Sequence, residues 1–516
     1  MKKIIVFLAG LFLFSFSQAQ ISGKQVDSLV QKSLKTFDVP GIAVAIIKDG
    51  KVILSKGYGV TSLNTNEKMN EHTRFGIASN SKAFTAAALG MLVDSGKIKW
   101  ITPVTDIIPE FKLYAPYVTE NFMIADLLTH RSGLGLGAGD LMFWPGNPDF
   151  SKEDIIHNLR YLKQVSQFRT KYDYDNLLYM VAGEVVARVS GMSWEDFIES
   201  HIMKPLGMEE SAASYSRLKD KGNVIDPHVP VNGKVRVVAR DINETLNAAG
   251  GIYSSVYDMS KWAIMQMNDG MFGEGLKQSL FSKKVHNEMW TIHTVIPTGE
   301  NSDYKTNFAG YGLGWVLRDE MGHKVATHTG GLLGIVTQVT LIPDMKLGII
   351  VFTNQQDGGA FVSITNSIKD AYYGIKGKDR IKEVFDKEQE SRNYANKIVT
   401  NVWNEINSIK TKLSVDDLKK YTGTFKDPWF GNVIISLRNG TLFFQAEKSE
   451  DLKGPMSYFK GNTFVVKWED RSLDADAFVN FSSDFQGNPN GIKMAAISPL
   501  TDFSFDFQDL NFTRIR

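Results

Sequence analysis

The sequence has no cysteine among its 516 residues. This absence excludes disulfide bonds and cysteine-ligated metal sites, and the nine histidines form neither an HExxH motif nor a close ligand pair. We therefore expect no metal and no other cofactor. Hydrophobic burial has to hold the fold together, and the length of the chain with its 43% hydrophobic content permits this.

Net charge is also nearly absent, since 58 basic and 57 acidic side chains leave a balance of +1. No basic stripe offers an electrostatic footprint for nucleic acid or for a lipid surface. We expect a small-molecule or peptide substrate and no nucleic-acid partner. The composition does not decide the oligomeric state.

Long hydrophobic runs are missing except at the N-terminus, "MKKIIVFLAGLFLFSFSQAQ". Two lysines precede an apolar stretch from Ile4 to Phe16, and small residues suited to cleavage follow. The stretch is shorter than the roughly 20 residues that a spanning helix needs. The pattern predicts a secretory signal peptide over residues 1–19 rather than a membrane anchor, and no cysteine follows for lipidation. The mature protein is expected to be secreted or periplasmic, without a stable membrane span.

Secondary-structure patterns divide the rest of the chain into three parts. Residues 20–375 begin with a helix and two β-branched runs around a turn at Asp49, and they close with two strands around Pro343 and a further helix. With helical segments in between, they predict an α/β domain whose sheet is mostly antiparallel, flanked by helices. Residues 376–411 predict a helical linker, and residues 412–516 predict a small all-β barrel or sandwich.

The stretch "RFGIASNSKAFTAAALGML" places Ser79 three residues before Lys82, at the start of an apolar helix. Residues three apart on a helix share a face, with Cβ atoms roughly 5–6 Å apart. A serine becomes a nucleophile when a neighbour accepts its proton, and a half-buried lysine loses its charge readily. The same spacing recurs in pairs that we interpret as solvated surface: Ser216–Lys219, Ser302–Lys305 and Ser457–Lys460.

Two later stretches add candidate partners. "KYDYDN" carries Tyr174 and Asn176 just before a predicted helix, and "HTGG" begins with His328 at a predicted strand. Alone, Tyr174 could be a surface aromatic and His328 an ordinary strand histidine. Together and in this order, the three elements resemble the serine β-lactamase and DD-peptidase superfamily, in its class C-like, penicillin-binding-protein-like branch. "LLTHRSGL", "MKPLGME" and "AGGIYSSVYDMSKWA" extend the resemblance over about residues 25–375.

The resemblance implies catalytic roles for three side chains. Ser79 would attack the acyl carbon and form an acyl-enzyme, while Lys82 and Tyr174 would share the proton transfers. A nearby Lys82 cation is expected to lower the pKa of the phenol from ~10 toward ~7. Whether Lys82 or Tyr174 accepts the serine proton stays open at this point.

The resemblance also implies a substrate-binding set. Asn176 would hold the substrate amide and orient Lys82, and the backbone N–H groups of Ser79 and Gly331 would form the oxyanion hole. Gly330 would let the substrate approach the strand edge. The remaining members are His328 and Thr329 of the same strand.

His328 bears on the substrate, because typical β-lactamases carry a lysine there that grips a carboxylate. Histidine is largely neutral at pH 7. A histidine at this position resembles the third motif of DD-peptidases, D-aminopeptidases and esterases of the superfamily. Asp175 adds negative charge near the cleft, or caps the following helix. We predict an exported serine hydrolase acting on amides or esters. The alternatives are a β-lactamase and a catalytically silent, penicillin-binding-like binding or sensor protein.

Two further sequence features do not contribute to the predicted hydrolase site. "GLGLGA" at residues 133–138 matches a dinucleotide fingerprint by letter but follows no βαβ strand, so it predicts a flexible loop beside the cleft. The C-terminal strands resemble the lipocalin-like modules appended to some members of the superfamily. The sequence does not say whether this domain covers the active site.

Overall fold

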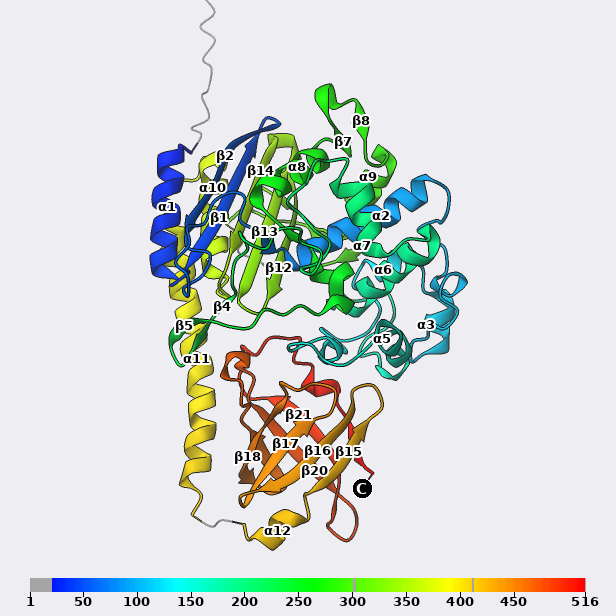
Figure 1. Ribbon diagram of the computed structural model, residues 1–516, viewed down its shortest axis with the longest axis vertical. Coiled ribbons are helices and arrows are strands. Elements are labelled where there is room, and N and C mark those ends of the chain that lie inside the picture. The colour runs from blue at the N-terminus through cyan, green and yellow to red at the C-terminus, as the bar shows by residue number, and fades with distance from the viewer. Residues whose placement is uncertain (1–20, 300–302, 411–412, 516) are drawn as a thin grey trace, which may run out of the picture.

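A computed structural model describes residues 21–299, 303–410 and 413–515. These residues form an α/β domain, one long helix and a closed β-barrel that lies beneath the α/β domain in Figure 1. The predicted signal peptide, residues 1–19, lies outside the described residues. Across the described ranges, we find no helix with the length and apolar character needed to cross a membrane.

An antiparallel sheet of eight strands forms the centre of the α/β domain. The predicted turn at Asp49 and Gly50 is confirmed, and both residues have the positive φ, 52° and 76°, that tight hairpins use. In spatial order the strands are β2 (Lys51–Gly59), β1 (Gly41–Lys48), β14 (Leu347–Thr353), β13 (Ile335–Ile342), β12 (His323–Leu332), β11 (Val316–Glu320), β10 (Ala309–Tyr311) and β9 (Thr294–Val295).

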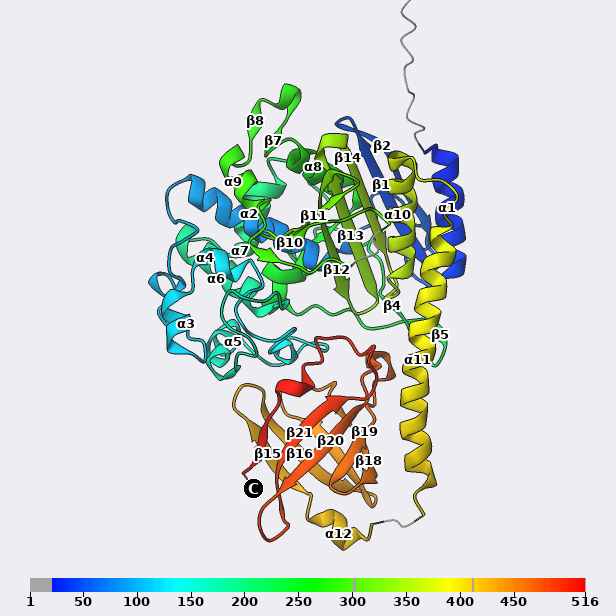
Figure 2. The ribbon, with the colours of Figure 1, turned by 180° about the vertical axis from the view of Figure 1, so that it is seen from behind.

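Helices cover both faces of this sheet (Figure 2). Because strand side chains alternate, Ile42, Val44 and Ile46 of β1 pack with α1 (Gly23–Thr36) and α10 (Gly359–Tyr373), whereas Ala43 and Ala45 join the core on the other face. That second core contains α8 (Val256–Met267) and the buried helix α2 (Ser81–Asp94). The sheet is therefore buried on both sides at its centre, and α2 is held against the sheet's inner core.

A helical region built around α2 forms the rest of this domain. Residues 101–150 contain only short helices, in line with their glycine and proline content, and the helix that begins at Trp194 changes to π-helical geometry after Ile198. The further helices are α3 (Pro116–Asn121), α4 (Ile124–Leu127), α5 (Lys152–Asn158), α6 (Leu177–Ser190), α7 (Trp194–Ile198) and α9 (Lys283–Met289). Two-stranded ladders pair β3 (Phe75–Gly76) with β6 (Tyr253–Ser254), β4 (His228–Val231) with β5 (Lys234–Val237), and β7 (Met271–Phe272) with β8 (Gln278–Ser279).

Helix α11 (Arg380–Ser408) lies within the expected linker 376–411 and runs along the side of the molecule for 29 residues. After α12 (Val415–Lys419) the chain closes an eight-stranded antiparallel barrel, so the predicted fold class is confirmed for both domains. The barrel strands are β15 (Gly423–Asp427), β16 (Gly431–Arg438), β17 (Thr441–Ala446), β18 (Lys453–Lys460), β19 (Thr463–Val466), β20 (Ala477–Ser483), β21 (Pro489–Ala496) and β22 (Phe512–Arg514).

Loops at one end of the barrel dock on the α/β domain. Asn158 Nδ2 donates a hydrogen bond of 2.8 Å to the carbonyl of Trp429. Lys448 pairs with Asp154 at 3.1 Å, and its ammonium lies 4.4 Å from the ring centre of Phe150. The barrel also contacts the loop of residues 133–144, where Asp506 accepts a hydrogen bond from the backbone N–H of Gly139.

Candidate active site

Ser79 lies in a tight turn between β3 and α2. The turn comprises Ala78–Asn80 in 3-10 geometry, and Ala78 adopts a left-handed conformation with φ of 51°. An alanine in this conformation costs about 1–2 kcal/mol, which the packing of the turn against β12 has to offset. Ser79 is half-buried while its neighbours are buried, so the sharp turn presents its hydroxyl at a cavity wall.

Lys82, in the first turn of α2, has no solvent-exposed surface. Its Nζ lies 3.0 Å from Ser79 Oγ, 2.7 Å from Asn176 Oδ1 and 2.9 Å from the carbonyl oxygen of Ala249. The amide and the carbonyl can only accept hydrogen bonds through these oxygens. A neutral amine would donate its two N–H groups to these two oxygens. Its lone pair could then accept the proton of Ser79.

The charge of Lys82 is unstable in this setting. Burial lowers the pKa of Lys82 to about 7, and the nearby Asp140 and Asp175 carboxyl groups oppose this shift. Both protonation states are therefore populated near neutral pH. This explains why a lysine occupies the start of a core helix: the desolvated position produces an amine that can accept a proton.

Tyr174 lies just before α6, with its ring centre 4.8 Å from Lys82 Nζ, and its hydroxyl interacts with Ser79 by a hydrogen bond. The expectation that the pKa of this phenol falls toward 7 is wrong. Burial raises the pKa of Tyr174 well above its usual value and outweighs the hydrogen bond from Ser79. Tyr174 therefore stays protonated, and Lys82 is the better proton acceptor of the two.

Asn176 joins the same cluster from the start of α6. Its Oδ1 accepts from Lys82, as expected, and its Nδ2 donates to Asp140 Oδ2 at 2.8 Å. Asp175 is fully buried, and its carboxylate accepts from the backbone N–H of Leu178 at 3.4 Å. Of the two interpretations of Asp175, the structure supports a helix cap, and the side chain does not line the cavity.

His328 lies on β12 and is held as a neutral imidazole. Its Nε2 lies 2.8 Å from the hydroxyl of Tyr311, and its Nδ1 lies 2.6 Å from the carbonyl oxygen of Thr329. Because a carbonyl accepts only, Nδ1 carries the proton and Nε2 accepts from the phenol. Burial lowers the pKa of His328 to about 3, and the nearby Lys82 adds to the shift. This residue therefore offers no positive charge to a substrate.

The second half of β12 runs beside the nucleophile. Strand β11 pairs only with residues 323–327, so in the described structure one edge of residues 328–332 has no strand partner. His328, Thr329 and Gly331 line the cavity, whereas Gly330 does not. A Cβ at Gly330 would lie 2.4 Å from the carbonyl oxygen of Ile77, so this glycine lets the Ser79 turn approach the strand rather than giving a substrate access to it.

The two adjacent glycines make a matched pair for a stability test. Gly330→Ala should destabilise the protein by about 1–3 kcal/mol, because the new methyl group overlaps the Ile77 carbonyl oxygen and the Thr337 hydroxyl. Gly331→Ala should stay within about 0.5 kcal/mol of wild type, since a Cβ there meets no atom within 4 Å. Urea unfolding of the two variants measures the difference. Equal unfolding midpoints would contradict the packing role of Gly330.

The cavity in front of Ser79 has a volume of about 520 Å³. Its walls are largely apolar and come from several segments, including Leu136 of the 133–138 loop, which lies beside the cleft, and Asp502, Phe503 and Ser504 of the barrel. The barrel therefore closes one side of the cavity. Among the described residues that line it there is neither lysine nor arginine, and burial raises the pKa of the lining Asp502 carboxyl group.

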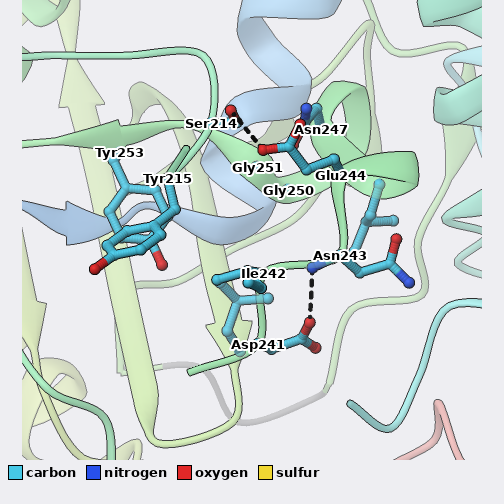
Figure 3. A pocket seen from close by; sticks show the side chains of 12 residues that line it. Ser214, Tyr215, Asp241, Ile242, Asn243, Glu244, Asn247, Gly250, Gly251 and Tyr253 are labelled. Carbon is cyan, nitrogen blue, oxygen red and sulfur yellow. Dashed lines mark hydrogen bonds between the residues drawn. The ribbon is translucent and has the colours of Figure 1, made fainter. Parts of the chain in front are cut away.

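A much smaller pocket adjoins this cavity and shares Leu246, Gly250 and Leu332 with it. Figure 3 shows its polar groups, with Glu244 accepting a hydrogen bond from Ser214 at 3.2 Å and Asp241 accepting one from the backbone of Asn243 at 3.1 Å. Its volume of about 20 Å³ has room for a water molecule but not for a substrate. We therefore place the candidate site in the larger cavity.

The structure brings Ser79, Lys82, Tyr174 and Asn176 together as the sequence predicts. Sequence reasoning missed Asp140, which hydrogen-bonds Asn176, and the barrel residues of the cavity wall. No local pattern marks these residues, because Asp140 lies 36 positions from Asn176 and 364 positions from Ser504. His130, within the quoted "LLTHRSGL", packs on the Tyr174 ring with centroids 4.2 Å apart, so that motif held a usable signal.

Comparison with known proteins agrees with this geometry. The chain is 29% identical to the unguisins hydrolase ungD of Aspergillus violaceofuscus over 68% of its own length and 65% of the relative's. It is 26% identical to protein flp of Staphylococcus aureus strain MW2 over 64% and 63% of the two lengths. The chain thus matches slightly less than two thirds of either relative.

The solved structure of an octameric penicillin-binding protein homologue from Pyrococcus abyssi covers 96% of this chain and all of its own, with a TM-score of 0.61 at 21% identity. This likeness concerns the fold. Residues 408–514 match a domain of unknown function, DUF3471, so the lipocalin likeness of the barrel stays a prediction. Residues 26–372 match the model of the Beta-lactamase family, and the chain therefore belongs to that family.

Proposed function

We propose that this protein is an exported serine hydrolase that forms an acyl-enzyme on Ser79 and cleaves uncharged, largely apolar amides or esters. The observation that carries the proposal is the position of Lys82 Nζ, buried and 3.0 Å from Ser79 Oγ, with hydrogen-bond acceptors as its two other partners. The name of one relative, a hydrolase, supports the reaction class. Export rests on residues 1–19 alone.

In the proposed reaction, the proton of Ser79 moves to Lys82 Nζ as Oγ bonds to the acyl carbon. The backbone N–H groups of Ser79 and Gly331 stabilise the negative charge that develops on the acyl oxygen. The bond to the leaving nitrogen or oxygen then breaks. The leaving group receives the proton that Lys82 took, passed on through the Tyr174 hydroxyl, and water releases the acyl group by the same steps.

The absence of positive charge in the described cavity lining limits the substrate. A carboxylate bound there would lose its hydration without gaining a cationic partner, since His328 is neutral and the lining residues include neither lysine nor arginine. This disfavours β-lactams and peptides that must be held by a free carboxylate. Neutral esters and amides with apolar acyl groups suit the walls better.

Active-site labelling tests the proposal. A fluorescent fluorophosphonate should label the wild-type protein and leave Ser79→Ala unlabelled, because the probe reacts with an activated serine. A fluorescent penicillin, which carries a carboxylate, should label the wild type weakly or not at all. Gel fluorescence after equal exposure to the two probes is the measurement.

The other outcomes separate the alternatives. Strong penicillin labelling that depends on Ser79 would contradict the proposed substrate charge and favour a β-lactamase. Failure of both probes on folded protein would contradict the hydrolase itself and favour a silent binding or sensor protein. A panel of nitrophenyl esters with neutral and carboxylate-bearing acyl groups then measures the charge preference directly.

A further inference from the structure

A loop of the barrel reaches the amide that holds Lys82. The loop connects β21 to β22, and Ser504 within it donates a hydrogen bond of 2.8 Å to Asp140 Oδ2. The same oxygen accepts the 2.8 Å hydrogen bond from Asn176 Nδ2. Asp140 itself is completely buried. A continuous path of hydrogen bonds therefore joins Ser504 to Ser79 through one carboxylate, one amide and one amine.

The loop is held in place by contacts besides Ser504. Asp506 accepts a hydrogen bond of 2.5 Å from the backbone N–H of Gly139, and the Phe503 ring meets the Tyr174 ring edge-on with centroids 5.9 Å apart. A Cβ at Gly137 would lie 2.7 Å from the Phe503 carbonyl oxygen. The loop thus docks closely on the segment that carries Asp140.

The orientation of Asn176 matters for the chemistry. An amide presents an accepting oxygen on one side and a donating NH₂ on the other, and a half-turn exchanges the two. Asp140 Oδ2 accepts from both Asn176 Nδ2 and Ser504 Oγ, so it keeps the NH₂ on its own side. The amide oxygen then faces Lys82. In the opposite orientation a donor would face the amine and compete with Ser79 for its lone pair.

We propose that Asp140 and Ser504 are positioning residues for the reaction, through which the barrel domain fixes Asn176 and thereby aims the Lys82 amine at Ser79. The inference rests on the proposed function, in which Lys82 accepts the serine proton. It makes the barrel part of the catalytic unit, and not merely a cover over the cavity. Neither residue needs to touch the reacting atoms.

Charge reinforces this arrangement. The Asp140 carboxyl group raises the pKa of Lys82, and the hydroxyl of Ser504 lowers the pKa of Asp140, although burial raises the latter more. Loss of either residue should therefore let the pKa of Lys82 fall further. The other titratable groups around Asp140 and Lys82 are Asp175, Asp506, His130, His328, Tyr174 and Tyr179.

The test uses the full-length protein and a neutral nitrophenyl ester. Ser504→Ala should lower kcat about 10-fold, as expected for losing a hydrogen bond to a charged group, and shift the acid limb of the kcat profile to lower pH. Asp140→Asn should shift the limb in the same direction by more. In the Asp140→Asn background the Ser504→Ala change should have little further effect, because both act through one carboxylate.

Two controls define the comparison. Ser504→Thr keeps a hydroxyl and should restore most of the activity. Ser498→Ala removes a hydroxyl from the same loop that accepts from the backbone of Leu500 at 3.1 Å, and it should behave as wild type. If Asp140→Asn does not fold, the Ser504 variants carry the test alone.

The experiment distinguishes failure of the positioning role from failure of the proposed hydrolase function. If Ser504→Ala raises KM while the pH profile stays unchanged, Ser504 only lines the cavity and the inference is wrong. Additive effects of the two substitutions would also overturn it. If hydrolysis by the wild type does not depend on Ser79, the proposed function fails instead.

Discussion

Replacement of Ser79 by alanine should reduce kcat/KM for a neutral ester by about 10⁴- to 10⁶-fold. The expected loss is this large because the other aliphatic hydroxyls of the described cavity lining, those of Thr329 and Ser504, form no hydrogen bond with the Lys82 amine. Whatever binding remains cannot replace the covalent step. Initial-rate kinetics measure the loss, and intact-protein mass spectrometry should show an acyl adduct on the wild type only.

Ser216→Ala is a matched control, since Ser216 also stands three residues before a lysine. The Ser216 hydroxyl hydrogen-bonds to the hydroxyl of Ser214 at 3.0 Å rather than to a lysine amine, so Ser216→Ala should leave the activity unchanged. If the Ser79→Ala protein folds normally and keeps more than a tenth of wild-type activity, the assignment of Ser79 as the nucleophile is wrong.

Removal of the Lys82 amine should have the second-largest effect. Lys82→Met keeps the length of the side chain but offers nothing to accept the proton, and we expect kcat to fall by about 10²- to 10⁴-fold. The exposed Lys97, just beyond the same helix, gives the control Lys97→Met, which should leave the rate unchanged.

The pH dependence of the wild type checks the same residue. Since burial lowers the pKa of Lys82 to about 7, the amine is protonated and inactive below this pH and free above it. kcat/KM should rise with pH and level off above about 8. The acid limb should be missing from the residual activity of Lys82→Met. An acid limb that persists unchanged in this variant would assign the proton transfer to another group.

Local chemistry made much of the fold predictable. The turn at Asp49 needs two residues with positive φ, and the Asp-Gly pair marks it whatever the rest of the chain does. In the C-terminal domain, the alternation of aromatic and polar residues likewise indicates β-strands. Closure of the barrel could not be deduced in this way, because it depends on the pairing of β15 with β22, which are far apart in sequence.

The site was predictable to the extent that its parts lie within short motifs. Ser79 and Lys82 are neighbours on one helix, but their meeting with Tyr174 came from resemblance and not from periodicity. The pKa of Tyr174 was mispredicted because a sequence shows nearby charge more readily than it shows desolvation, and here burial dominates. The role of Gly330 was misassigned because its close neighbour, Ile77, belongs to a different segment.

The hydrogen bond between Ser504 and Asp140 spans 364 positions of the chain. During synthesis, the nucleophile and the amine are therefore made long before the last wall of their cavity. Until residues 502–504 have been made and have docked, the cavity lacks the wall that they form. A chain that lacks these residues would therefore carry the nucleophile and the amine without a complete cavity around them.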